Sequence, residues 1–259
     1  MGTVSKALSL LDLFDRSRPR IGLSEMTRLS GMNKATVHRL LTELTKHGYV
    51  EQVGSGREYQ LGPVYLRLAA LREAAVPTRE LSQHVLRKLS DATHETAHMS
   101  SVQGDRLITL AYAYSAAHGT RVMMEDAEIL TFHGTSSGLA VLAYASEEWV
   151  NHLLEGPLPA RTEDTVTDPQ KIREMLQRTR ETGIAEYIGG FEKDVHSHAC
   201  PIFDANHAAV GAISVAAPVS RITPELTQII CCEVKRHALE LTRLVGGFPP
   251  DTYNRALPA

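Results

Sequence analysis

The sequence predicts an α+β protein with a small helix-rich part followed by a larger part built on a mostly antiparallel sheet. Residues 4–61 show the order helix, helix, turn, helix and hairpin, whereas strand-like and helix-like segments alternate after residue 78. A length of 259 residues accommodates two modest domains. With 43% hydrophobic and 22% charged residues, the composition is that of a globular protein and excludes a disordered or collagen-like chain.

The first part of the chain contains three short helical patterns. Apolar residues recur at helical spacing over 4–14, and Ser24 is a good N-cap for a second helix over 25–30. After a turn at 31–33, Asn33 can cap a third helix over 34–47, which Gly48 ends.

Two alternating runs follow the third helix, at 49–53 and 57–61, and flank a Gly-Ser-Gly turn. They predict a β-hairpin. Three helices, the second and third joined by a turn that contains Gly31, and a hairpin are the order of a winged helix-turn-helix.

The third helix is predicted to be the DNA-recognition element, because the N-terminal residues of that helix face base edges in the major groove. Lys34 and Arg39 can neutralise phosphates or bond guanine, and Thr36 can bond phosphate or contact a thymine methyl. The expected DNA-binding set is Asn33, Lys34, Ala35, Thr36, His38 and Arg39 on the helix, with Arg57 on the wing. The alternative is a plain three-helix domain whose charges form a solvated face.

The net charge of −3 is unevenly distributed. Residues 1–67 contain 10 Lys and Arg against 6 Asp and Glu, a net of +4, and the remainder contains 17 against 24, a net of −7. A basic first quarter on an acidic body favours a polyanionic partner for the N-terminal part.

A boundary between two domains is expected near Pro77. The expected organisation is a winged helix-turn-helix at 1–62, an Ala/Leu-rich linker helix at 63–77, a second domain at 78–245 and a flexible tail at 246–259. In the second domain, strands are predicted at 96–102, 107–114, 184–187, 196–203 and 209–215, and helices at 78–93, 137–146, 147–154, 169–182 and 223–244.

A cytoplasmic location is expected. No apolar run approaches the roughly 18–20 residues that span a bilayer, and the first residues lack a signal-peptide pattern. Three cysteines, two of them adjacent, form neither a disulfide framework nor a CxxC zinc site. No membrane association and no cofactor are expected.

Seven short blocks resemble the IclR-type transcriptional regulators over about residues 4–245. They are KATVHRLL at 34–41, GYV at 48–50, YQLG at 59–62, HGTSSG at 133–138, TVTDP at 165–169, CPIFD at 200–204 and SRIT at 220–223. The resemblance implies a winged helix-turn-helix, a linker helix and a GAF-like effector domain. It also implies a homodimer or homotetramer on a palindromic double-stranded operator.

The sequence departs from the family pattern at three places. Leu139 stands where a Lys usually follows the loop glycine, His196-Ser197 replaces the usual Arg-Cys, and YIGGF at 187–191 replaces an acidic run. These differences indicate a pocket with a different lining.

The loop at 134–138 is the candidate effector site. It leads into an apolar helix, and a helix N-terminus offers free N–H groups to a carboxylate or phosphate. The resemblance implies that this loop lines the effector pocket and, residue by residue, adds Tyr187, Ser197 and Ser214. The expected effector set is His133, Ser136, Ser137, Tyr187, Ser197 and Ser214, which suits a small organic acid or carbonyl compound. The alternative is an ordinary helix cap without a ligand.

The histidines suggest a second possibility. His196 and His198 lie on one face of a predicted strand, a spacing that can chelate a metal, and His133 could complete a three-ligand site. A metal-dependent enzyme or metal sensor would follow. Alternation places Ser197 on the pocket face, which favours two histidines turned to solvent or an interface; with the faces reversed, the histidines would line the pocket.

The preferred hypothesis is a DNA-binding regulator, and the protein is not expected to be an enzyme. An enzyme, such as a serine hydrolase using Ser136, would leave the basic N-terminal part without a role. We expect a repressor of a catabolic operon whose operator affinity is controlled by the small effector. A purely structural dimerisation module would leave the Gly/Ser loop without a role.

Overall fold

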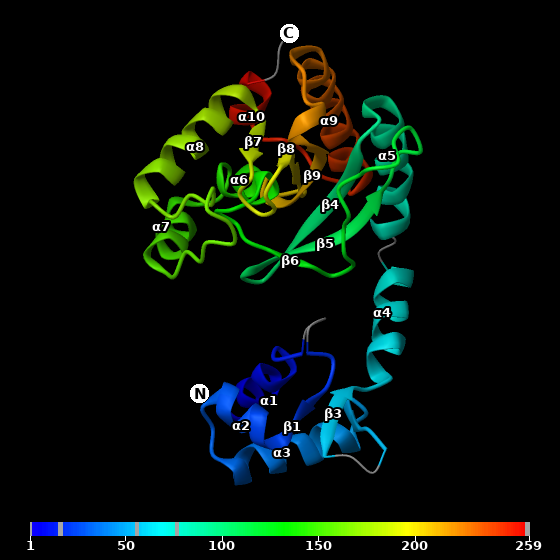
Figure 1. The fold of residues 1–259 in the computed structure, drawn as a ribbon, viewed down its shortest axis with the longest axis vertical. Coiled ribbons are helices and arrows are strands. Elements are labelled where there is room, and N and C mark those ends of the chain that lie inside the picture. Colours follow the sequence, from blue (N-terminus) through cyan, green and yellow to red (C-terminus); the bar gives the residue numbers. More distant parts are fainter. Residues whose placement is uncertain (1, 15–17, 55–56, 76–77, 257–259) are drawn as a thin grey trace. The chain divides into compact units, whose positions relative to one another are not determined.

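The computed structural model describes residues 2–14, 18–54, 57–75 and 78–256. It divides into two compact units, an N-terminal unit of residues 1–77 and a C-terminal unit of residues 78–259 (Figure 1). Each unit is described separately below. Within the described ranges, every helix is too short or too polar to cross a lipid bilayer.

The N-terminal unit is a winged helix-turn-helix with a three-stranded antiparallel sheet in the order β1-β3-β2. Its elements are α1 (Thr3–Leu11), β1 (Ile21–Gly22), α2 (Leu23–Ser30), α3 (Lys34–Lys46), β2 (Val50–Gln52), β3 (Glu58–Leu61) and α4 (Val64–Ala75). The predicted helices and hairpin are present. The short strand β1 was not predicted, because two residues carry too little pattern; it forms where Ile21 pairs with Tyr59.

The core of this unit fixes how α3 is presented. Leu10 of α1, Met26 of α2 and Val37 and Leu41 of α3 are fully buried against one another. Gly31 ends α2 at a φ of +65°, a left-handed conformation that glycine adopts without strain. The apolar side of α3 therefore faces inward, and its opposite side faces solvent.

The C-terminal unit is built on a six-stranded antiparallel sheet in the order β6-β5-β4-β9-β8-β7 (Figure 1). The strands are β4 (Thr96–Gln103), β5 (Arg106–Ala113), β6 (Ile129–Leu130), β7 (Ala185–Ile188), β8 (Val195–Phe203) and β9 (Ala209–Pro218). The helices are α5 (Thr78–Thr93), α6 (Ser136–Leu142), α7 (Glu147–Glu155), α8 (Pro169–Thr182), α9 (Pro224–Leu244) and α10 (Asp251–Arg255), with a 3-10 turn, η1, at Val219–Arg221.

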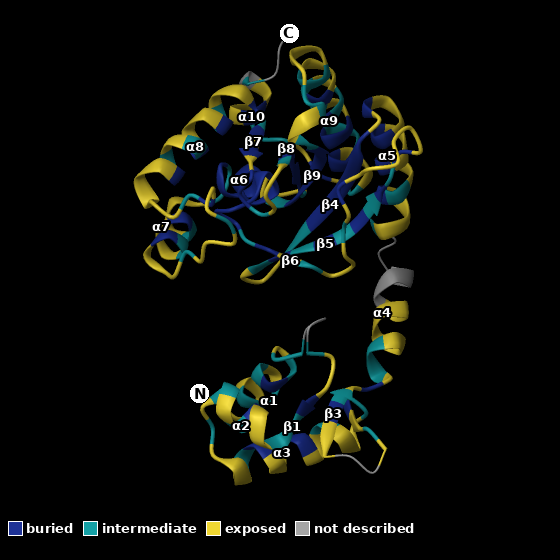
Figure 2. Cartoon of the chain, in the orientation of Figure 1, coloured by how far each residue is buried: buried dark blue, intermediate teal, exposed yellow. Residues whose placement is uncertain are grey.

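The two faces of this sheet bury different helices. Leu89 of α5 and Val234 of α9 pack on one face with Ile213 and Val215 of β9. The opposite face packs against α6, with α7 and α8 outside it. Figure 2 shows α6 buried along its whole length, whereas α8 exposes its outer side. The predicted α+β class is confirmed.

The C-terminal segment was predicted as a flexible tail, and for residues 246–256 that prediction is wrong. The segment ends in α10, whose Tyr253 is fully buried. Its ring packs edge-on against Tyr144 and Phe203, with ring centroids 5.4 and 5.2 Å apart. The glycines and prolines of 246–250 suggested fraying, but the aromatic side chain that follows them supplies enough apolar contact to anchor the segment.

Candidate functional site

The start of α3 forms an exposed, positively charged surface on the N-terminal unit. Asn33 caps the helix: its side-chain oxygen accepts a hydrogen bond from the Thr36 amide at 2.8 Å. This oxygen is therefore already used in capping the helix. Lys34, His38 and Arg39 are exposed. Within the described ranges, neither Lys34 nor Arg39 has a carboxylate within ion-pairing distance.

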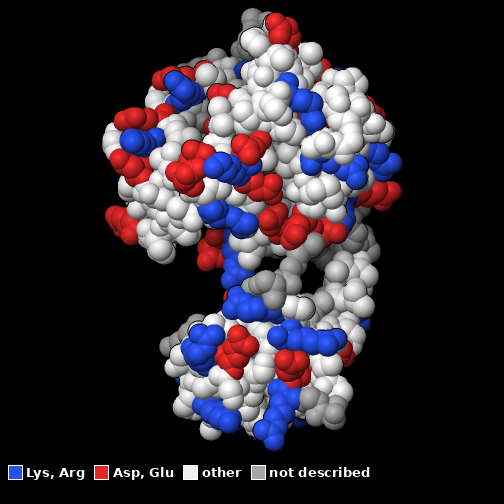
Figure 3. Space-filling view, in the orientation of Figure 1, with Lys and Arg blue, Asp and Glu red and all other residues white. Residues whose placement is uncertain are grey.

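The wing contributes to the same surface. Arg57 lines one groove together with Lys34 and His38 of α3. Figure 3 shows that Lys and Arg dominate the charged groups on the visible face of the N-terminal unit. Lys34, Arg39 and Arg57 thus bring positive charge to this surface. The other predicted residues bring hydrogen-bonding groups, except Ala35, which is exposed but has no polar side chain.

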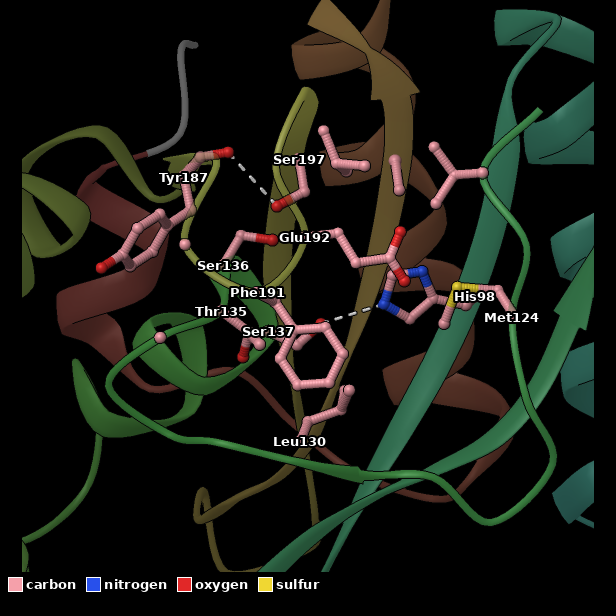
Figure 4. A pocket seen from close by; sticks show the side chains of 15 residues that line it. His98, Met124, Leu130, Thr135, Ser136, Ser137, Tyr187, Phe191, Glu192 and Ser197 are labelled. Carbon is pink, nitrogen blue, oxygen red and sulfur yellow. Dashed lines mark hydrogen bonds between the residues drawn. The ribbon is translucent and has the colours of Figure 1, made fainter. Parts of the chain in front are cut away.

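The C-terminal unit contains a small, partly open cavity between the start of α6 and the sheet. Its lining combines apolar side chains with a few polar groups, as small-molecule sites do. Four of the predicted effector residues line it: Ser136, Ser137, Tyr187 and Ser197 (Figure 4). The sequence did not single out His98, Phe191, Glu192, Met124, Val122 and Leu130, which also line it.

The loop before α6 is shaped by its own backbone. Thr135, and not a serine, is the N-cap: its hydroxyl accepts a hydrogen bond from Gly138 N at 3.0 Å, and its carbonyl accepts one from Leu139 N at 3.0 Å. A Cβ at Gly138 would lie 2.2 Å from the Phe132 carbonyl oxygen, so close packing requires glycine there. The first two amides of the helix belong to Ser136 and Ser137, which line the cavity. These amides have no hydrogen-bond acceptor within the helix.

His98 is the most strongly perturbed group in the cavity. It lies on β4, and its Nε2 is 3.3 Å from the Ser137 hydroxyl (Figure 4). Its Nδ1 is buried and has no hydrogen-bond partner in the described part of the chain. Burial lowers the pKa of His98 to about 4, so the imidazole is neutral near pH 7.

Tyr187 and Glu192 also line the cavity, but only Glu192 adds an ionisable group to it. The Tyr187 hydroxyl accepts a hydrogen bond from Val166 N at 2.8 Å, so it points away from the cavity, and burial raises its pKa. Burial also raises the pKa of Glu192, although Arg161 opposes the shift. Among the described residues, the lining contains a carboxyl group and an imidazole but neither Lys nor Arg.

Two predicted effector residues do not line the cavity. His133 is buried, and its Nε2 lies 3.1 Å from the Pro159 carbonyl oxygen. Ser214 is fully buried behind Ser136, with 3.4 Å between their hydroxyl oxygens, and donates to the His198 carbonyl at 2.9 Å. Sequence order alone could not distinguish a residue that lines the cavity from one, such as Ser214, that lies immediately behind it.

The predicted set of three histidines does not come together. His196 and His198 lie on the α9 face of β8, opposite to Ser197, as alternation predicted, and they are buried there. Their neighbour is Glu186 of β7, whose Oε1 is 2.7 Å from His196 Nε2. The hydrogen bond from His196, with His198 close by, holds the pKa of Glu186 well below its usual range. His133 belongs to a different part of the unit.

A recognition helix on a basic unit and a small-molecule cavity in a second unit define a ligand-responsive DNA-binding regulator. Family models agree with this class: the IclR helix-turn-helix domain matches residues 3–54, and the bacterial transcriptional regulator IclR C-terminal domain matches residues 72–243. The chain belongs to the IclR family of bacterial transcriptional regulators, which are not enzymes.

Individual relatives support the assignment. The transcriptional repressor IclR of Escherichia coli K12 is 28% identical over 254 residues, covering 95% of this chain and 90% of that protein. A Silicibacter sp. TM1040 crystal structure, assigned to an IclR-type regulator, is 55% identical with a TM-score of 0.93 and covers 97% and 99% of the two chains. An IclR homolog from Microbacterium hydrocarbonoxydans, complexed with 4-hydroxybenzoate, shares the fold at 22% identity and a TM-score of 0.75, with 95% and 99% coverage.

The buried neutral His98 predicts a specific pH dependence of stability. The unfolded chain takes up a proton at this residue below about pH 6.5, whereas the folded protein does so only near pH 4. The unfolded state therefore binds more protons between these values, and the free energy of unfolding falls as the pH drops through this window. His98→Gln should remove up to about 3 kcal/mol of that fall, measured by urea unfolding at pH 7, 5.5 and 4.5.

The exposed His152→Gln is the matched control and should leave the pH dependence unchanged. If the free energy of unfolding changed with pH in the same way for the wild type and His98→Gln, then His98 would be protonated equally in the folded and unfolded states.

Proposed function

We propose that the protein represses a catabolic operon by binding a palindromic operator, and that a small organic acid bound in the C-terminal cavity reduces this binding. The observation that carries the proposal is the pairing of an exposed basic recognition helix with a partly open cavity that holds neutral hydrogen-bond donors. Two relatives, the transcriptional repressor IclR and the acetate operon repressor of Salmonella typhimurium, favour repression.

The α3 surface is the proposed DNA contact. Lys34 and Arg39 are exposed, and Lys34 shares a groove with His38 and with Arg57 of the wing, so one docking orientation brings helix and wing to the duplex. Thr36 and Ala35 lie on the first turn, where base edges are closest. The capped Asn33 orients this turn; its amide nitrogen remains for a phosphate.

Lys34→Ala and Arg39→Ala should each weaken operator binding. Loss of one phosphate contact should also reduce the slope of log K against log salt by about one. The slope is measured by fluorescence anisotropy with a labelled fragment of the protein's own promoter. Lys46→Ala, in the last turn of the same helix, is the control and should bind like the wild type. If the wild type and the three variants bound the operator with equal affinity, α3 would not be part of the DNA-contacting surface.

A homodimer, or a homotetramer of two such dimers, is the proposed assembly. Half-sites about one helical turn apart need two recognition helices. The N-terminal unit exposes large apolar side chains that suit a partner copy: Val4 and Leu8 on α1, and Leu66 and Leu71 on α4, are 54–78% exposed.

Leu66→Glu combined with Leu8→Glu should convert the dimer to monomers, because each change places a charge in an apolar contact. Light scattering after size exclusion at micromolar concentration measures the mass. The control is Ile129→Glu, an exposed apolar residue of β6. A wild-type monomer that still binds the operator tightly would contradict the proposal.

The cavity suits a small ligand with an acceptor at one end and a donor at the other. The amides and hydroxyls of Ser136 and Ser137 can bond a carboxylate or carbonyl, and the neutral His98 can share a hydrogen bond with it. Glu192, on the same cavity, favours a hydroxyl or amine on the ligand. The apolar side chains between them suit a compact hydrocarbon body, and 4-hydroxybenzoate, the ligand of one homolog, has this chemistry.

Ser137→Leu should abolish the effector response and leave operator binding intact, because the two sites lie in different units. In the wild type, the effector should lower operator affinity by roughly 5–150-fold. The measurement is operator binding with and without 4-hydroxybenzoate and a panel of small hydroxy and oxo acids. Ser137→Ala, which keeps the volume and loses the His98 contact, should respond weakly.

Ser101→Leu, on β4 outside the cavity, is the control and should respond like the wild type. A full response of Ser137→Leu would place the effector site elsewhere.

A further inference from the structure

The edge of the C-terminal sheet carries a second polar cluster, on the face opposite to the effector cavity. Glu186 of β7 is the direct cross-strand partner of His198 on β8, and His196 lies two residues away on the same face. One donor atom from each of these three residues lies within 4.8 Å of the others. The proposed regulator function makes no use of this cluster.

Hydrogen bonding within the cluster leaves one of its members unsatisfied. His196 Nε2 is 2.7 Å from Glu186 Oε1, but His198 Nε2 is 3.6 Å from the same oxygen. The His198 side chain is only 2% exposed, and neither of its ring nitrogens has a hydrogen-bond partner within the described ranges. A buried polar atom without a partner is costly, so a ligand that occupies this position would relieve the cost.

The geometry of the cluster suits a metal ion. In a tetrahedral zinc site, with ligands at about 2.0–2.1 Å, the donor atoms lie roughly 3.3 Å apart. The two distances from Glu186 Oε1, 2.7 and 3.6 Å, bracket this value, so small side-chain rotations would complete the site. The imidazole rings stack at 4.5 Å between centroids, which directs both Nε2 atoms toward the same carboxylate.

We propose that Glu186, His196 and His198 bind one first-row divalent transition-metal ion, with zinc the preferred candidate. Two imidazoles and one carboxylate are typical ligands of zinc, copper, nickel and iron, whereas magnesium and calcium prefer oxygen ligands. Glu186 is 47% exposed, so solvent can reach the cluster and supply a water as fourth ligand.

The ion would have a structural role. β7 has four residues and pairs only with β8 in the described sheet, so it is a short edge strand. Coordination would connect β7 and β8 through side chains in addition to their backbone bonds. Tyr187 and Ser197, the next residues along these two strands, face the effector cavity. The ion would thus support one wall of the cavity from behind.

Calorimetric titration of the EDTA-treated, desalted full chain with Zn²⁺ tests the site. We expect one equivalent bound at micromolar affinity or tighter, and little heat from Mg²⁺. Zn²⁺ at 100 times its dissociation constant should also raise the Tm of the protein by roughly 5 °C. His198→Gln and Glu186→Gln should each weaken zinc binding by at least about tenfold.

Exposed histidines elsewhere on the chain can also attract zinc, so His152→Gln serves as the control and should bind like the wild type. Because His198 is buried, its replacement could disturb folding; Glu186→Gln, at an exposed edge, provides a variant whose fold is checked by circular dichroism. Absence of stoichiometric zinc binding by the wild type, or wild-type affinity in a folded Glu186→Gln protein, would overturn the proposal.

Discussion

The organisation of the C-terminal unit depends on one constraint: its sheet is covered on both faces, so alternation along each strand assigns successive side chains to different environments. On β9, Ile213 packs under α5 and α9, whereas Ser214 faces α6. On β8, Ser197 lines the cavity beside α6, and His198 lies on the other face of the sheet. A shift of one residue in the register of β8 would exchange these roles.

The cavity lies where the start of α6 meets the sheet. The helix lies close to the sheet because Gly138 fits against the Phe132 backbone. Leu139, where the family usually has Lys, is buried in the apolar core, so it brings no charge to the cavity. With His98 neutral near pH 7, the hydrogen-bond donors of the lining are uncharged, so the proposed ligand would be recognised through directed hydrogen bonds.

The two units differ in the charge and the burial of their candidate binding surfaces. The proposed DNA surface of α3 is exposed, basic and accessible to a long polyanion, whose phosphates require positive charge. The C-terminal cavity is partly open, and burial of its lining disfavours charge on both His98 and Glu192. Burial also strengthens hydrogen bonds to the cavity wall, since water competes less for the same groups.

The sequence alone predicted the helix-turn-helix and five of the six strands of the larger sheet, and it favoured the face on which Ser197 lies, because each depends on local periodicity or capping. It also indicated the loop at Ser136 and Ser137 through its small polar residues. Only the tertiary structure decided that His98 lies beside Ser137, that Glu186 and not His133 joins His196 and His198, and that Tyr253 anchors the C-terminus. These contacts join residues far apart in the chain or on different strands, and their formation depends on strand order and register, which no local pattern encodes.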